Sequence, residues 1–399
     1  MANAVIVDAI RSPMAKGRPP KDGKPGGALS AVHPVDLLAS LLADLFRRND
    51  IDPASVDDVI TGCVSQVGEQ SMGVGRLAWL GAGLPESVPS VTINRACGSS
   101  QQAADFAAQT ILAGAADIVV ACGVESMSRV PMFSARIGQD PYGAKVAERY
   151  RPGLVPQGIS AELVAARAKL SREELDDYSA RSHQRAAAAS FEREIAAIES
   201  VDGAGNPVTV NADETVRPAT TAEGLSALKP VFYNEELAER FPEITWQITA
   251  GNSSQITDGA SALLIMSEER ANALGLRPRA RFHSFAVAAS DPLTMLTGPI
   301  PATEKVLERS GIALADIDHY EVNEAFASVP LAWQRHFDAD PDKINPRGGA
   351  IALGHPLGAS GGRLLTTMLH ALEDTGGRYG LQTMCEAGGM ANATLIERL

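Results

Sequence analysis

Asn94-Arg95-Ala96-Cys97-Gly98-Ser99-Ser100-Gln101-Gln102 joins a predicted strand, residues 88–93, to an alanine-rich predicted helix, residues 103–112. Cys97 is therefore expected in a turn at a helix N-terminus. Unpaired N–H groups and the positive end of the helix dipole favour a thiolate at such a position. The alternative is a buried cysteine that packs as a small hydrophobic residue.

The composition indicates a soluble α/β protein with more than one lobe. The chain has 399 residues, of which 45% are hydrophobic and 21% charged. Its formal net charge of −13 argues against nucleic-acid partners and against anionic membrane surfaces. An anionic small ligand would need a local basic patch. No apolar run is long enough to span a bilayer and no secretory signal is recognisable, so we expect no membrane span.

The four cysteines are spread over the chain, at Cys63, Cys97, Cys122 and Cys385. None belongs to a Cys-x-x-Cys pair, so the sequence predicts neither a metal site nor a thioredoxin-type motif. Scattered cysteines in a chain of this size fit a reducing compartment, and we expect a cytoplasmic protein.

Strand and helix patterns alternate along most of the chain. An irregular region rich in proline and glycine, residues 125–250, interrupts them, and residues 201–229 within it are expected to be loops. Ser171 and Glu174 have the spacing of a capping box. Strands are expected at 5–9, 59–64, 117–123 and 260–266, and helices at 34–48, 75–81, 160–168, 172–197 and 363–372.

The last third of the chain resembles the first. A helix followed by residues 51–62 matches a helix followed by residues 312–323, and residues 114–123 match residues 376–385. Repetition on this scale indicates an internal duplication, which would place equivalent turns face to face across a pseudo-twofold axis. Ligand sites in such sheets lie beyond the carboxyl ends of the strands.

His355 lies in a stretch with six glycines, residues 348–362. The stretch lacks the Lys-Ser/Thr of a phosphate-binding P-loop, so we expect its glycines to let the backbone approach a bound molecule. A single histidine is often structural. Paired with a cysteine at a strand end, it instead fits an activated nucleophile.

Two further strand ends carry polar groups. Asn323 is either the N-cap of a helix that starts there or an amide that holds a water or a carbonyl oxygen. Cys385 ends the last long strand, and it is either a buried strand cysteine or a second acid–base group.

Taken together, five separated motifs resemble the thiolase family, and the similarity extends over residues 11–397. The Asn-Glu-Ala-Phe form argues against ketoacyl synthases, which pair the cysteine with two histidines, and against sterol-carrier-type thiolases. The motifs are the Cys-x-Ser turn at Cys97, Asn-Glu-Ala-Phe at 323–326, Gly-His-Pro at 354–356, the terminal Cys-x-x-Gly-Gly turn at Cys385, and residues 251–259.

The resemblance implies an α/β, thiolase-like fold of two duplicated βαβαβ-type halves stacked in layers. The N-terminal half would span residues 1–270, with a loop domain inserted at about 125–250, and the C-terminal half residues 271–399. Such proteins are homodimers or homotetramers, so a homo-oligomer is expected.

By the same resemblance, Cys97 attacks the 3-keto carbon of a 3-oxoacyl-CoA and His355 accepts its proton. Cys385 protonates the acetyl-CoA enolate and then deprotonates the incoming CoA. The oxyanions would be held by His355 with a water on Asn323, and by the backbone N–H groups of Cys97 and Ala387. Coenzyme A would be a substrate, with no permanently bound cofactor.

Substrate contacts carry over by position. Ser254 matches a residue at the pantetheine arm, and the other substrate or CoA candidates are Arg217, Phe232, Phe326 and Gln157. Arg217 is either a phosphate contact or a solvated surface charge. The sequence departs from common family patterns at Pro156-Gln157-Gly158, Gly224 and Ala387.

The sequence therefore predicts an acyltransferase that degrades long or bulky 3-oxoacyl-CoA, from fatty acids or sterol side chains, to acetyl-CoA and a shortened acyl-CoA. The alternatives are a biosynthetic thiolase forming acetoacetyl-CoA, a non-catalytic acyl-CoA-binding subunit, and a condensing enzyme that uses an acyl-carrier protein.

Overall fold

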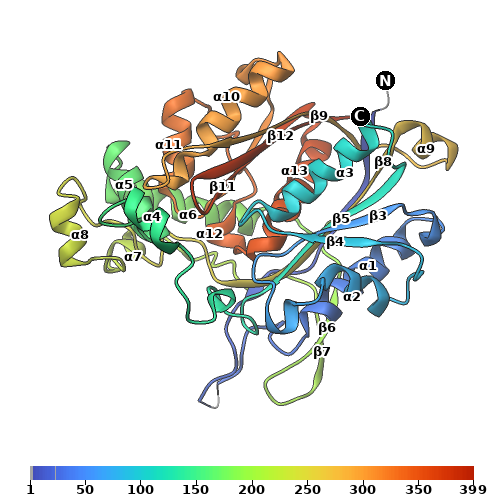
Figure 1. The fold of residues 1–399 in the computed structure, drawn as a ribbon, viewed down its shortest axis with the longest axis horizontal. Helices are drawn as coiled ribbons and strands as arrows, with labels where there is room; N and C mark the ends of the chain where they lie inside the picture. The colour runs from blue at the N-terminus through green and yellow to red at the C-terminus, as the bar shows by residue number, and fades with distance from the viewer. Residues whose placement is uncertain (1–2, 23) are drawn as a thin grey trace.

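A computed structural model describes residues 3–22 and 24–399, in which one mixed sheet forms the backbone of the fold (Figure 1). Its strands follow the order β10-β11-β12-β9-β1-β8-β5-β3-β4, and β2 pairs with β8. None of the helices in this described part is long and apolar enough to cross a bilayer. The strands are β1 (Ala4–Arg11), β2 (Ala15–Lys16), β3 (Asp58–Gly62), β4 (Ser90–Ile93), β5 (Ile118–Ser126), β6 (Ile198–Val201), β7 (Pro207–Val210), β8 (Thr257–Ser267), β9 (Ala280–Ala289), β10 (His319–Val322), β11 (Tyr379–Glu386) and β12 (Met390–Arg398).

The sheet repeats one pairing pattern. β3 runs parallel to β5, while β5 to β8 and β8 to β1 are antiparallel. In the same way β10 runs parallel to β11, while β11 to β12 and β12 to β9 are antiparallel. β1 and β9 join the two sets at Val5↔Arg281 and Ile6↔Ala280. The expected duplication into two α/β halves is confirmed.

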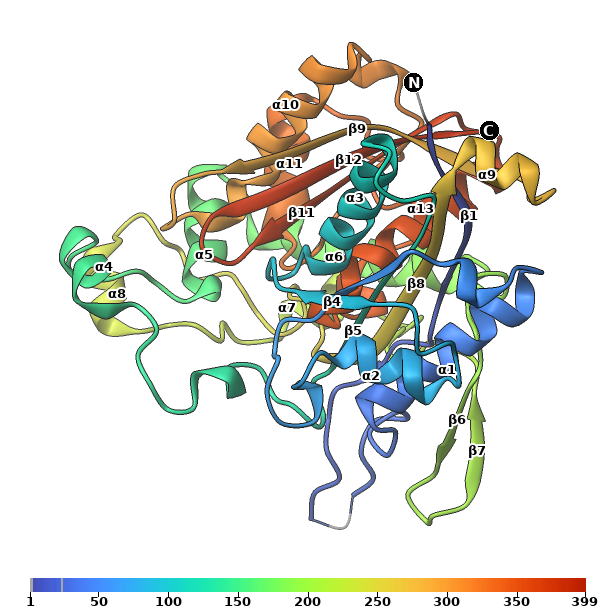
Figure 2. The ribbon, with the colours of Figure 1, turned by 45° about the vertical axis from the view of Figure 1, so that its right-hand side comes forward.

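Helices of the two halves form a middle layer and two outer layers, while α4, α7 and α8 of the inserted region lie to one side (Figure 2). α3 and α13 pack on each other between the two halves of the sheet, through a cluster that includes Ala104, Ala108, Leu365 and Met368. α1 and α2 cover one outer side, and α10 and α11 cover the other. The helices are α1 (Pro34–Arg48), α2 (Val74–Gly81), α3 (Ser99–Leu112), α4 (Gly143–Arg149), α5 (Gln157–Arg167), α6 (Arg172–Ala188), α7 (Ala222–Ser226), α8 (Glu235–Arg240), α9 (Glu268–Ala273), α10 (Pro299–Ser310), α11 (Ser328–Phe337), α12 (Ala350–Leu353) and α13 (Ser360–Thr375).

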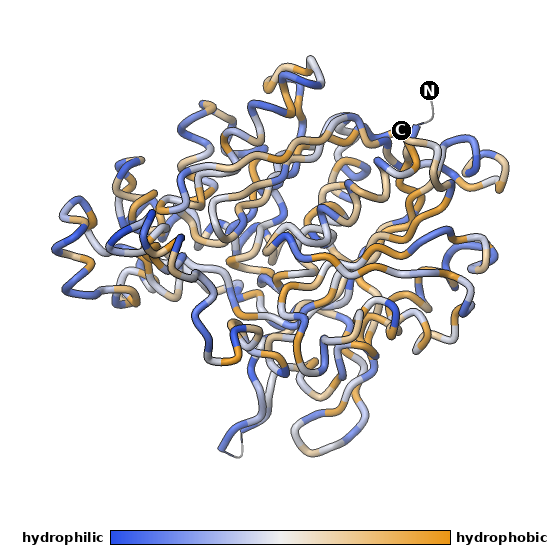
Figure 3. Tube along the Cα trace, viewed as in Figure 1, coloured by the Kyte–Doolittle hydropathy of each residue, from blue (hydrophilic) through white to orange (hydrophobic). Residues whose placement is uncertain are grey.

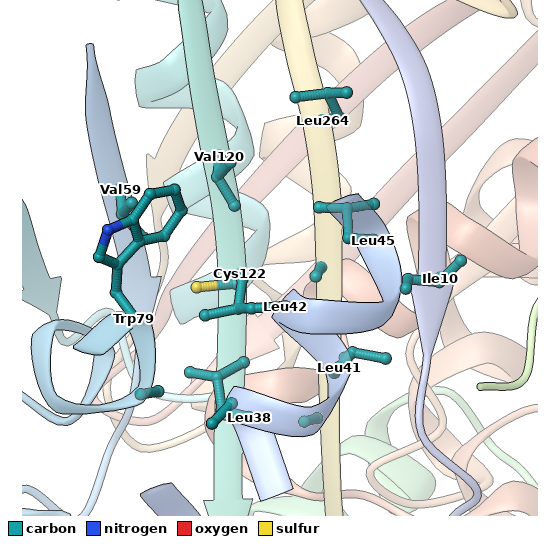
Figure 4. Close-up of a cluster of buried hydrophobic side chains, with 14 of the residues drawn as sticks. Ile10, Leu38, Leu41, Leu42, Leu45, Val59, Trp79, Val120, Cys122 and Leu264 are labelled. Carbon is teal, nitrogen blue, oxygen red and sulfur yellow. The ribbon is translucent and has the colours of Figure 1, made fainter. Parts of the chain in front are cut away.

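α1 shows how sequence pattern becomes packing. His33 caps it by accepting a hydrogen bond from the Val35 N–H, and Pro34 occupies its first turn, where no N–H is needed. Its leucines at 37, 38, 41, 42 and 45 recur at helical spacing and are all buried against the sheet and Trp79 (Figure 4). The hydropathy trace shows the same concentration of apolar residues along the central strands (Figure 3).

The region expected to be irregular holds more structure than the sequence indicated. The hairpin β6–β7 and the short helix α7 lie within residues 201–229 and beside them, and α6 ends at Ala188 rather than at residue 197. The cause of the early end is the tertiary pairing of the following segment with β1. There the Ala196 N–H donates to the Arg11 carbonyl and the Arg11 N–H donates to the Glu194 carbonyl, both at 2.8 Å. The capping box of Ser171 and Glu174 is confirmed.

A buried ion-pair cluster attaches this region to the first strand. The Arg11 side chain is fully buried and contacts the carboxylates of Glu194, at 2.5 Å, and Asp213, at 2.7 Å. Removing one partner from a buried ion pair leaves an uncompensated charge, so this cluster fixes the position of the segment against β1.

Glycine makes the close crossing of α3 and α13 possible. A Cβ added at Gly361 would lie 2.3 Å from the backbone N of Gln101 and 2.6 Å from its Cβ. Both helix N-termini therefore approach each other more closely than any side chain would allow.

We expect Gly361→Ala to lower the free energy of unfolding by about 1–3 kcal/mol, because the added methyl group overpacks this crossing. Gly81→Ala is the matched control, since a Cβ there would meet Ala39 at an ordinary 3.5 Å. Urea denaturation followed by circular dichroism measures both. Equal stability of the two variants would contradict the assignment of a tight crossing.

Candidate active site

Cys97 lies in a sharp turn between β4 and α3. Ala96 adopts a left-handed conformation, with φ of 45°, and accepts a hydrogen bond from the Ser99 hydroxyl at 2.6 Å. The Asn94 side chain accepts from the Ala96 N–H at 2.8 Å. These local bonds fix the turn and leave Cys97 at the start of the helix, which begins at Ser99 rather than at residue 103.

Cys97 lies at a helix N-terminus and is also buried, so features of both interpretations of this cysteine are present. Cys97 is only 5% exposed, and burial raises the pKa of its thiol well above the ordinary value. Ionisation of Cys385 or of Glu386 raises this pKa further. Desolvation therefore outweighs the helix dipole, and the thiol needs a base to become a nucleophile.

His355 has the chemistry of that base. The Ser360 hydroxyl donates to the Pro356 carbonyl at 2.9 Å, so it accepts from His355 Nδ1, 2.6 Å away. This assigns the ring proton to Nδ1 and leaves the lone pair on Nε2, which is buried with no partner in the described part of the chain. Burial, followed by the charge of Arg363, lowers the pKa of His355 to about 3.

A buried carboxylate joins the histidine turn to the cysteine turn. Glu125 accepts hydrogen bonds from the backbone N–H groups of Val64 at 2.9 Å, Ser65 at 3.0 Å and Gly358 at 2.9 Å. The Asn94 amide in turn donates to the Val64 carbonyl at 3.1 Å. Leu357, beside Gly358, packs against Cys97. Residues 94–99 and 355–360 are thereby held against each other.

Cys385 and Asn323 complete the centre. Asn323 follows β10, and its N–H donates to the Thr383 carbonyl of the neighbouring strand at 3.1 Å. Burial raises the pKa of Cys385 to about 12, although the adjacent Asn323 side chain lowers it in part. Neither amide atom of Asn323 has a conventional hydrogen-bond partner within residues 3–22 and 24–399. A buried, unpaired amide of this kind is poised to hold a water or a ligand oxygen.

The N-cap interpretation of Asn323 is wrong, because α11 begins only at Ser328. The turn after Asn323 is instead anchored by Glu324. Its carboxylate accepts from the hydroxyls of Tyr178 at 2.9 Å and Ser182 at 2.7 Å, and from the Ile351 N–H at 3.0 Å.

The stretch 251–259 connects the two turns and brings two candidate CoA residues near them. The Ser254 N–H donates to the Ala325 carbonyl at 3.0 Å, and the His355 N–H donates to the Gln255 carbonyl at 3.1 Å. Arg217 donates to the Gln255 side chain at 3.0 Å while its side chain remains at the surface.

A second group of candidates forms an aromatic wall next to this stretch. Phe232 and Phe326 meet edge to face, with ring centroids 6.1 Å apart. A Cβ at Gly158 would lie 2.4 Å from the Phe232 ring, so the glycine after Gln157 lets this ring pack flat on α5. Ala387 is exposed, in the β11–β12 turn that begins after Glu386.

The structure thus brings Cys97, Cys385 and Asn323 near one another and holds the His355 turn against the Cys97 turn. Ser254 and Arg217 lie along the stretch that contacts these turns, and Phe232 packs against Phe326 and beside Gln157. The sequence analysis assigned no role to Ser360, Glu125 or Glu386. For Ser360 a signal was available, because it lies five residues after His355 within the glycine-rich stretch. In the described residues, no group of three or more His, Cys, Asp or Glu side chains is arranged to hold a metal ion.

Comparison with known proteins agrees with this geometry. Residues 4–269 match the thiolase N-terminal domain and residues 276–398 the thiolase C-terminal domain. A steroid 3-ketoacyl-CoA thiolase of Mycobacterium tuberculosis is 48% identical, over 100% of this chain and 95% of the relative. A 3-ketoacyl-CoA thiolase of Pseudoalteromonas translucida is 44% identical over the full length of both chains. The crystal structure of the Bacillus anthracis acetyl-CoA acetyltransferase superposes with a TM-score of 0.87 at 35% identity, covering 100% of this chain and 99% of that one. The chain, with its buried cysteine and histidine turns facing each other across a duplicated fold, belongs to the thiolase family.

Proposed function

We propose that this thiolase cleaves a 3-oxoacyl-CoA with CoA, giving acetyl-CoA and an acyl-CoA shortened by two carbons. One observation supports the proposal: Glu125 holds the turn of His355 against the turn of the buried thiol Cys97, and Cys97 lies near the second thiol, Cys385. Among the described residues His355 Nε2 has no hydrogen-bond partner. Carbon–carbon cleavage through an acyl-thioester needs a nucleophile, a base for it, and a separate acid for the leaving carbon.

In the first half-reaction the Cys97 proton moves to His355 Nε2, and the sulfur attacks the 3-keto carbon. The bond between carbons 2 and 3 then breaks. Its electron pair stays on the acetyl-CoA fragment as an enolate, which takes the proton of Cys385, and the acyl group remains on Cys97. In the second half-reaction a CoA thiol gives its proton to Cys385 and attacks the acyl-thioester, and Cys97 regains the proton from His355.

The resting protonation states suit this sequence. Both thiols are protonated at neutral pH because burial raises their pKa values, and His355 is neutral because burial lowers its pKa to about 3. Asn323, whose amide atoms have no hydrogen-bond partner in the described residues apart from the neighbouring Cys385, is proposed to hold a water for the oxyanion together with His355. The backbone N–H groups of Cys97 and Ala387 are proposed as the second oxyanion site.

Coenzyme A is a substrate in this proposal, with no permanently bound cofactor. Ser254 is assigned to the pantetheine arm, and Arg217, at the surface beside Gln255, to a phosphate. Gln157, Phe232 and Phe326 are assigned to the acyl and nucleotide approaches. The two relatives described above are named for 3-ketoacyl-CoA, one of them for steroid substrates, and both are more similar to this chain than the acetyl-CoA acetyltransferase is. This favours degradation of long or bulky substrates over acetoacetyl-CoA synthesis.

The remaining expectations stay proposals. Residues 1–270 and 271–399 are proposed as the two halves, with the loop domain inserted at about 125–250, and the junction of β1 with β9 supports this division. Exposed apolar side chains support a homodimer or homotetramer, because a partner subunit could cover them. Val91 lies on β4, at the edge of the sheet, and Phe106 and Leu112 lie on α3. A cytoplasmic location is supported by the four free cysteines.

Incubation with a 3-oxoacyl-CoA in the absence of free CoA is expected to leave a shortened acyl group on Cys97, read by peptide mass. Cys97→Ser should lose this adduct and at least about 10³-fold in kcat, while retaining CoA binding by calorimetry. An adduct on another residue, or a protein inert towards all 3-oxoacyl-CoAs, would favour the non-catalytic alternative.

Ser360→Ala should lower kcat/KM by about 10- to 100-fold, because His355 loses the partner that fixes its tautomer. Ser179→Ala is the matched control, since the Ser179 hydroxyl is also buried and also bonds a carbonyl four residues earlier, that of Leu175. Unchanged steady-state kinetics in Ser360→Ala, at normal stability, would contradict the assigned role.

Thiolysis of acetoacetyl-CoA should be slower, in kcat/KM, than thiolysis of 3-oxoacyl-CoA with a long or ring-bearing acyl group. A panel of substrates assayed by loss of the 3-oxoacyl absorbance measures this. Strong preference for the four-carbon substrate would identify a biosynthetic enzyme. Discharge of the acylated protein by an acyl-carrier protein, but not by CoA, would identify a condensing enzyme.

A further inference from the structure

Glu386 is a buried carboxyl that the proposed reaction does not use. It is the last residue of β11 and follows Cys385 directly, and its side chain is fully buried. Neither of its oxygens has a hydrogen-bond partner within the part of the chain that the structure describes. Leaving a carboxylate unpaired in the interior is costly, so its place next to the reacting thiols calls for a physical explanation.

The carboxyl lies directly against the nucleophile turn. A Cβ built on Gly98 would be 2.1 Å from Glu386 Oε1 and 3.0 Å from the Asn392 amide nitrogen. That amide donates to the Gly98 carbonyl at 3.2 Å. Gly98 is the N-cap of α3 and the neighbour of Cys97. Glu386 and Cys97 therefore share the N-terminal end of one helix.

The surroundings of Glu386 contain one cation and one further carboxyl. Arg95 favours the ionised form of Glu386, and Asp105 on α3 opposes it. Asp105 accepts from the Thr394 hydroxyl at 2.7 Å, and its other oxygen is unpaired among the described residues. The titratable and charged groups that face Glu386 and Cys97 from the elements packed here are Arg95, Asp105, Cys385, Glu125 and the imidazole of His355, whose turn is held against that of Cys97.

Two anions cannot both be stabilised at this helix end. The dipole and the free N–H groups of α3 lower the energy of a negative charge at Cys97, and a second charge at Glu386 cancels part of that effect. Burial, with the neighbouring Asp105, raises the pKa of Glu386 to about 8. Glu386 is therefore neutral below this pH and ionised above it, and its ionisation raises the pKa of Cys97.

We propose that Glu386 is a positioning residue that acts through Cys97: its neutral carboxyl permits the thiolate at the N-terminus of α3, and its ionised carboxyl opposes it. Glu386 thus limits the reactivity of Cys97 on the alkaline side. The inference rests on Cys97 being the nucleophile of the proposed function.

The test measures the rate of alkylation of Cys97 by iodoacetamide as a function of pH, read by peptide mass, in wild type and in Glu386→Gln. Glutamine keeps the size of the side chain and stays neutral. We expect equal rates below pH about 7 and a ratio of variant to wild type that rises to about tenfold by pH about 9.5, the equivalent of one pKa unit at Cys97.

Glu162→Gln is the matched control. Glu162 is likewise buried and burial raises its pKa, but it bonds the backbone N–H groups of Gln247 and Ile248 away from both thiols. This variant should keep the wild-type pH dependence.

Asp105→Asn provides an independent arm if Glu386→Gln does not fold. Burial raises the pKa of Asp105 itself to about 8, so Asp105→Asn removes a like charge that develops over the same pH range as that of Glu386. The pKa of Glu386 should fall in this variant, and the pH at which Glu386 begins to slow alkylation of Cys97 should be lower than in the wild type. The pH profiles of kcat/KM for thiolysis should differ between the wild type and these variants in the same direction as the alkylation profiles.

The outcomes separate this inference from the proposed function. No alkylation or acylation of Cys97 in the wild type would overturn the proposed function itself. Alkylation with a pH-independent ratio between Glu386→Gln and wild type would overturn only the role of Glu386, because a purely structural defect lowers the rate equally at every pH.

Discussion

The close crossing of the α3 and α13 N-termini is the constraint on which the rest of the structure depends. Each helix follows one of the two reactive turns, and Gly361 allows the backbones to approach where any Cβ would collide with Gln101. Because α3 precedes β5 and α13 precedes β11, duplication places Cys97 and His355 at equivalent positions of the two halves. The candidate active site therefore forms only where the two halves pack against each other, since Cys97 belongs to one half and His355 to the other.

Burial decides the chemistry at this crossing. Burial raises the pKa of the Cys97 and Cys385 thiols and lowers the pKa of His355, so these three groups are neutral before substrate binds. A neutral centre avoids the desolvation cost of buried ions, and proton transfer within it generates charge only when the substrate is present. Family membership and the physical properties of the residues lead to the same reaction.

The buried glutamates Glu125, Glu324 and Glu386 differ in their hydrogen-bond partners, and the partners distinguish what each residue does. Glu125 and Glu324 each accept several hydrogen bonds and hold the turns that carry His355 and Asn323. Glu386 accepts none from the described residues and lies against Gly98. A carboxylate with donors stabilises a loop, whereas one without donors acts on its neighbours through its charge.

The sequence by itself determined the α/β class, the duplication and the stripe of leucines on α1, because these depend on local periodicity and on repetition along the chain. It also grouped Cys97, His355, Cys385 and Asn323 in one set of motifs, because each motif is a short pattern. It left open whether Cys97 is a thiolate or a buried thiol and whether Asn323 caps a helix, and it ended α6 too late. Those points needed the tertiary structure, since desolvation and the pairing of residue 196 with β1 arise from segments far apart in the chain. Only the folded protein decided that Ser360 fixes the tautomer of His355 and that Glu386 reaches Gly98, because no spacing along the chain encodes a contact between residues 98 and 386.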